Sequence, residues 1–148
     1  MKHTTFLAAL VAIAMVSCTK DTGSIEGPAE TSSKFIQFSL AQSKDYFQPE
    51  YQGLSAGVTI AVSKVTLATG QSTLLWDSSI AIQPITNYPV MHHPFTFGKV
   101  FHDIDDHRET LSYSCWIVYR DRNEQLTSEG KNQFIATGNS ASLILVNP

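Results

Sequence analysis

The segment 111-LSYSCWIVYR-120 decides the fold class of this chain. One set of alternate positions carries Leu111, Tyr113, Cys115, Ile117 and Tyr119, and the other set carries Ser112, Ser114, Trp116 and Val118. A repeat of two residues is the pattern of a β-strand, because successive side chains point to opposite faces of a sheet. Large apolar groups stand on both faces, so we expect a central strand whose two faces are both partly covered.

Shorter segments of the same kind lie on both sides of it. We expect further strands at residues 34–41, 57–68, 72–77, 80–85, 95–101, 125–128, 133–136 and 142–146. The turn Thr69-Gly70-Gln71 makes 57–77 the clearest hairpin. No stretch after Ser33 shows a sustained helical repeat. The sequence therefore predicts an all-β protein, an antiparallel β-sandwich of immunoglobulin-like or prealbumin-like kind; a small β-barrel is the alternative, since strand number does not separate open from closed sheets.

One of these strands changes its apolar register. Val58, Ile60 and Val62 share a face, but the next apolar side chains are Val65 and Leu67, one position out of step. A straight strand would turn half of these side chains to water. We therefore expect a β-bulge or bend near Ser63-Lys64.

Length and charge restrict the class of protein. The chain has 148 residues, a formal net charge of −3 and 16% charged residues, and its Lys and Arg are not clustered. Residues 34–148 suffice for one domain with one core. Nucleic-acid binding needs a concentrated positive surface, so no nucleic-acid partner is expected.

The first eighteen residues have the composition of an export signal. Lys2 is followed by an apolar run from Phe6 to Val16, which is too short to span a bilayer stably, and the small residue Ser17 precedes Cys18. Met15-Val16-Ser17-Cys18 resembles the lipobox of bacterial lipoproteins, in which the cysteine is acylated. Thr19-Lys20-Asp21 resembles the start of surface-exported lipoproteins of the Bacteroidota.

This resemblance implies a domain order and a location. Residues 1–17 would be the signal peptide, residues 18–33 a tether rich in small and polar residues, and residues 34–148 the β-sandwich. Cys18 would carry the lipid and attach the domain to the membrane of the cell envelope, with the outer membrane and its exposed surface as the expected location. The alternative interpretation of these residues is a plain signal peptide, which would leave Cys18 as an unpaired thiol.

The cysteine count bears on the core. Cys18 and Cys115 are the two cysteines of the chain, so a lipid on Cys18 leaves Cys115 without a disulfide partner. Cys115 shares its strand face with Leu111 and Ile117, and we expect a buried, reduced and unreactive side chain. A domain of this size can fold without a disulfide.

The densest group of ionisable side chains is 102-HDIDDHRE-109. Its imidazoles and carboxylates could bind a divalent metal, and Asp103-x-Asp105 begins like a calcium loop. An EF-hand needs Gly at the sixth position and Glu at the twelfth, where this chain has Arg108 and Ser114. A solvated turn fits the segment better. His92-His93 are adjacent and point apart, and they are expected at the opposite end of a strand from His102; no metal ligand is therefore assigned.

No motif of a known catalytic class is present in the sequence, and neither catalytic residues nor a cofactor are assigned. The sequence favours a non-enzymatic envelope lipoprotein that binds or scaffolds a protein or glycan partner, with a metal-binding protein that uses residues 102–109 as the alternative. We expect the recognition surface on two long loops at an end of the sandwich. Their candidate residues are Tyr46, Phe47, Tyr51, Asn87, Tyr88, Met91 and His92. The competing interpretation is that these aromatic rings close the end of the core.

Overall fold

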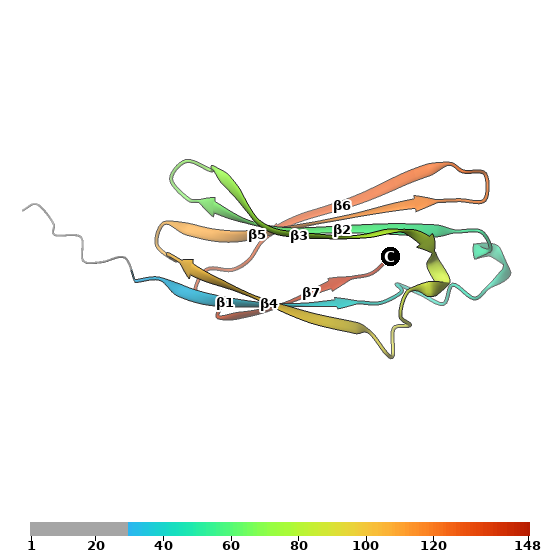
Figure 1. Cartoon of the computed structure of the whole chain (residues 1–148), viewed down its shortest axis with the longest axis horizontal. Coiled ribbons are helices and arrows are strands. Elements are labelled where there is room, and N and C mark those ends of the chain that lie inside the picture. The colour runs from blue at the N-terminus through green and yellow to red at the C-terminus, as the bar shows by residue number, and fades with distance from the viewer. Residues whose placement is uncertain (1–29) are drawn as a thin grey trace, which may run out of the picture.

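The computed structural model describes residues 30–148, which form two β-sheets packed face to face (Figure 1). The described part contains β1 (Ser32–Leu40), β2 (Ser55–Thr66), β3 (Ser72–Pro84), β4 (Phe95–Ile104), β5 (Glu109–Arg120), β6 (Leu126–Phe134) and β7 (Ala141–Val146), with short 3-10 turns at Pro49–Tyr51 and Ile85–Asn87. The expected all-β sandwich is confirmed. The lipobox, Cys18 and most of the tether lie outside the described residues.

The strand order distinguishes the open β-sandwich from the closed β-barrel. One sheet has the order β4-β1-β7 and the other β3-β2-β5-β6, and both are open, so the barrel alternative is wrong. β1 pairs antiparallel with β4 and parallel with β7. An immunoglobulin constant-type order would place the first strand beside the second, and the third beside the sixth. The observed order differs from it, since the first strand lies between the fourth and the seventh.

The segment that was expected to be central is central. β5 lies between β2 and β6, and its register with β2 runs without a shift from Ser55↔Arg120 to Thr66↔Glu109. Its inward face is buried as expected, and Cys115 is 7% exposed. Burial raises the pKa of the Cys115 thiol. On the other face Ser112, Ser114 and Val118 are half-buried, so the expected partial cover holds for them and fails at Trp116, which is 53% exposed.

The expected bulge lies on the neighbouring strand. The β2–β3 ladder shifts between Val62 and Ser63, but Val62 pairs with Trp76 and Ser63 with Leu74, so the extra residue is Leu75 of β3. β2 itself runs straight along β5 through Val65. The expectation for Val58, Ile60 and Val62 holds, since all three are buried.

Two pairs of expected strands are single strands. Residues 72–77 and 80–84 belong to β3, with Ile85 in the 3-10 turn that follows, and β6 joins residues 126–128 and 133–134 of the other two expected strands. β3 contains two register shifts that interrupt its alternation. All nine residues of β6 are exposed, so no buried face imposes a pattern on its sequence. β1 also begins at Ser32, two residues earlier than expected.

The core lies between the sheets and contains an aromatic group at the β3–β4 side. Phe38 of β1 is fully buried, and its ring lies 5.3 Å from that of Trp76 and 5.0 Å from that of Phe97, measured between centroids. Trp76 belongs to β3 and Phe97 to β4, so these rings join the two sheets at their adjacent edges. Tyr113 of β5 donates its hydroxyl to the side chain of Gln133 on β6.

Candidate functional site

Two loops meet at the end of the sandwich where β1 and β3 finish, at the right of Figure 1. The first covers residues 41–54, between β1 and β2, and the second covers residues 85–94, between β3 and β4. Gln42 joins them: its side-chain amide donates to the carbonyls of Tyr88 at 2.8 Å and Ile85 at 3.3 Å, and its backbone N–H donates to Pro89 at 2.8 Å. Gln42 is 2% exposed, so these bonds are shielded from water and hold the loops in a fixed arrangement.

Three of the four aromatic rings expected on the recognition surface close the core instead. Tyr46 is 5% exposed and Tyr88 2%, and Tyr51 packs edge-on against Tyr46 at 5.1 Å. The Tyr88 hydroxyl donates to the carbonyl of Ala56 at 2.9 Å, and burial raises the pKa of Tyr88. The expectation of an aromatic binding surface is therefore wrong for these three tyrosines. Phe47 differs, since it is 65% exposed.

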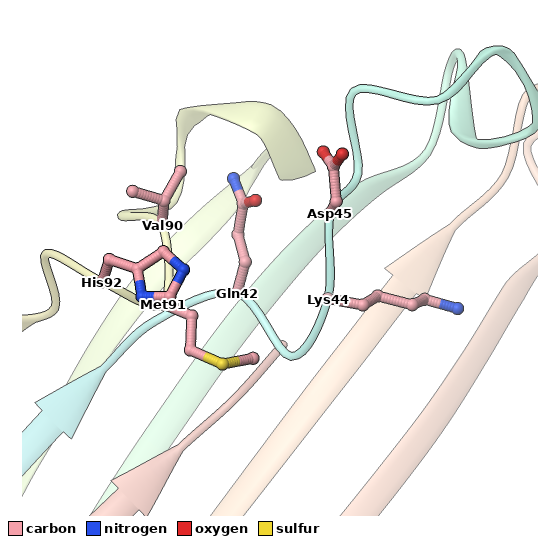
Figure 2. A pocket seen from close by; sticks show the side chains of 6 residues that line it. All are labelled: Gln42, Lys44, Asp45, Val90, Met91 and His92. Carbon is pink, nitrogen blue, oxygen red and sulfur yellow. The ribbon is translucent and has the colours of Figure 1, made fainter.

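Between the same loops lies a cavity of about 400 Å³. Figure 2 shows Val90, Met91 and His92 on one side, Lys44 and Asp45 on the other, and Gln42 between them. Met91 is 58% exposed and Val90 39%, so apolar surface is open to solvent at its mouth. Met91 and His92 were expected from the sequence. Gln42, Lys44, Asp45 and Val90 were not, and the polar stretch that holds the first three gives no sign of which loop it will face.

Each charged residue of this cavity has a local role. The Lys44 ammonium group lies 4.3 Å from the centre of the Tyr51 ring and 5.4 Å from that of Tyr46, within the range of cation–π contact. A hydrogen bond to Tyr51 raises the pKa of the exposed Lys44. The Asp45 carboxylate accepts hydrogen bonds from the backbone N–H of Phe47 and the side chain of Gln48. These contacts hold the loop while leaving the cavity open.

The segment 102–109 forms structural contacts at the other end of β4, so it does not lie near His92 and His93. Asp106 pairs with the buried Lys34 and accepts from Ser32, and Glu109 pairs with Lys64 at 2.8 Å. Asp105 is 8% exposed and accepts from the backbone N–H of His107. The expectation that the whole segment faces solvent is wrong for Asp105 and for Ile104, the last residue of β4. Within residues 30–148, no three His, Cys, Asp or Glu side chains are grouped closely enough to hold a metal ion.

The Lys34–Asp106 pair makes stability depend on pH. Lys34 donates to Asp106 and lowers the pKa of its carboxyl. A carboxyl whose pKa is lowered by folding stabilises the protein above its unfolded pKa of about 4, and this contribution is lost as the pH falls through the folded pKa. The Lys34 side chain is 7% exposed and the Asp106 side chain 27%. The contribution of this ion pair to stability is therefore expected to lie between that of a fully buried pair and that of a fully exposed pair.

We expect Asp106→Asn to lower the free energy of unfolding by about 1 to 3 kcal/mol at pH 7, because it leaves a buried ammonium group without its counter-charge. The loss should be smaller at pH 3, because the carboxyl is then largely protonated in the unfolded state, where its pKa is about 4, and part of the stabilising contribution is already lost. Urea unfolding at both pH values measures this, with the exposed Glu50→Gln as control. An equal loss at both pH values would contradict the linkage.

The chain was compared with protein-family models, curated proteins and solved structures. None of them matches. In residues 30–148 there is also no helix of the length and apolar character needed to cross a membrane.

Proposed function

We propose that this protein is a lipid-anchored component of the bacterial cell envelope whose β-sandwich is a non-enzymatic binding or scaffolding module. The observation that carries the binding role is the cavity between loops 41–54 and 85–94. It stands on a fixed support, since the buried Gln42 joins both loops and Tyr46 and Tyr88 close the core beneath them. Loops fixed on a rigid sheet are where binding residues concentrate.

The lining favours a partner with both apolar and polar groups. Val90 and Met91 supply apolar contact, and the flexible thioether of Met91 adapts to different shapes. Asp45 and His92 supply a carboxylate and an imidazole at the same mouth. A loop or chain end of an envelope protein offers that combination, so we propose a protein partner at this cavity.

Site-specific photo-crosslinking tests the binding role. A photoreactive residue at Met91, in cells that produce the full chain, should give a discrete crosslinked product, and Val90→Asp in the same protein should remove it. The same probe at the exposed Ser79 of β3 serves as control. Equal crosslinking from Met91 and Ser79, or a product unchanged by Val90→Asp, would contradict a site at the cavity.

The lipid anchor has its own prediction. Cys18→Ala should abolish labelling of the protein by a fatty-acid probe in cells, because alanine has no sulfur atom to acylate, and the acyl chains are what anchor the domain stably. Mass spectrometry of the mature wild-type protein should find a modified amino terminus at Cys18. An unmodified amino terminus at Thr19 or beyond would end the lipoprotein interpretation.

A further inference from the structure

The outward face of the β3-β2-β5-β6 sheet carries an exposed tryptophan. Trp116 lies in the middle of β5, is 53% exposed, and pairs with Gly130 on β6 and Thr59 on β2. A Cβ atom at Gly130 would stand 2.6 to 2.7 Å from atoms of the indole six-membered ring. The ring therefore packs against the bare backbone of Gly130, while much of its surface stays open to solvent.

A second ring stands on the same face, further along the strands. Phe134 of β6 is 65% exposed and pairs with Ser112, which is four residues before Trp116 on β5. At the rise of a β-strand, four residues correspond to about 13 Å. A depression of about 250 Å³ adjoins Phe134, with Val65, Ser112 and Asn132 among its lining residues.

The surface between the two rings is polar and uncharged. Side chains alternate between the faces of a strand, so the residues that share this face with Trp116 are every second one on β2, β5 and β6. Over this length they are Thr59, Ala61, Ser63, Ser112, Ser114, Gly130 and Asn132. Hydroxyl and amide groups both donate and accept hydrogen bonds. The part of the face on β5 and β6 therefore matches a ligand that is neutral, rich in hydroxyl groups and apolar on one surface, whereas the carboxylate of Asp77 lies on the same face two strands away, on β3.

We propose that this face of β5 and β6 binds a neutral glycan. A sugar ring presents C–H groups on its flat surface and hydroxyl groups around its edge. The C–H surface would stack on Trp116 and Phe134, and the hydroxyl groups would bond to Ser112, Ser114 and Asn132. This site lies on a sheet face, not on the loops of the proposed protein-binding cavity, so either can fail without the other.

The other sheet shows why a protein partner fits this face less well. Its outward side exposes Phe35, Val100, Leu143 and Leu145, an apolar group of the kind found in protein interfaces. Between Trp116 and Phe134 there is no such continuous apolar surface. An added peptide strand would pair along the free edge of β6 and would not cover the sheet face on which Trp116 stands.

Affinity gel electrophoresis of the full chain, purified in detergent, tests the proposal with dextran, mannan, xyloglucan and a soluble β-1,3-glucan, and with polygalacturonate as an anionic polymer. At least one neutral polymer should retard the protein. Trp116→Ala should weaken that binding about tenfold or more, since a stacked ring contributes of that order. Gly130→Ala should also weaken it while keeping both rings, because the added methyl group displaces the indole.

Phe35→Ala is the matched control. Phe35 is a half-exposed ring over a cross-strand glycine, Gly98, as Trp116 is over Gly130, but its neighbours are apolar. This variant should bind like the wild type, and circular dichroism should show that all three variants are folded. Retardation by none of the neutral polymers, retardation by polygalacturonate alone, or wild-type binding by Trp116→Ala would each overturn the proposal.

Discussion

Phe38→Ala is expected to lower the free energy of unfolding by about 3 to 5 kcal/mol, the range measured when a buried phenylalanine is truncated. Phe38 is fully buried and packs against Trp76 and Phe97, which come from opposite sheets. Removing its ring deletes a contact to each sheet at once. Because the strands around it are held by their own ladders, the space is expected to close only in part.

Urea unfolding followed by tryptophan fluorescence measures this loss, since Trp76 lies against the deleted ring. Phe47→Ala is the control: Phe47 is 65% exposed, and its truncation should change stability by less than about 0.5 kcal/mol. If the two variants lost similar amounts, the aromatic group would not be the centre of the core.

The fold class was predictable because a strand with one buried face carries an apolar residue at every second position of its sequence. That constraint acts most strongly on β5, whose neighbours β2 and β6 fix its register on both sides. It fails for β6, where every residue is exposed and the sequence LTSEGKNQF has no alternation of apolar and polar residues. It also fails at Leu75, where an extra residue on an edge strand moves the following side chains to the other face.

The candidate site was predictable in position but only partly in its residues. Long loops rich in aromatic residues indicated the correct end of the sandwich. The sequence does not say whether a tyrosine there faces the core or the solvent, because a buried ring needs only a hydroxyl partner, and Tyr46 and Tyr88 find theirs in Ser43 and Ala56. Trp116 is the reverse case: an apolar side chain on a central strand that the fold leaves exposed.

The second large effect on stability is expected from the buried side-chain amide of Gln42. We expect Gln42→Leu to lower the free energy of unfolding by about 2 to 3 kcal/mol, because a buried carbonyl without a donor costs about 1 to 3 kcal/mol. The Tyr88 carbonyl loses the donor at 2.8 Å, whereas the Ile85 carbonyl still accepts from the backbone N–H of Tyr88. Leucine fills a similar volume, so the loss reports the hydrogen bonds more than a cavity.

The same change should loosen the loop that carries Val90 and Met91, since their loop is tied to residues 41–54 through Gln42. Limited proteolysis should therefore cut within residues 85–94 faster in Gln42→Leu than in the wild type. Gln48→Leu is the matched control, because Gln48 lies in the same loop but is exposed, and its side chain donates to the exposed Asp45 and not to the other loop. Equal stability and equal cleavage in the two variants would show that the loops are held by the backbone bond of Gln42 to Pro89, and that the cavity does not depend on its side chain.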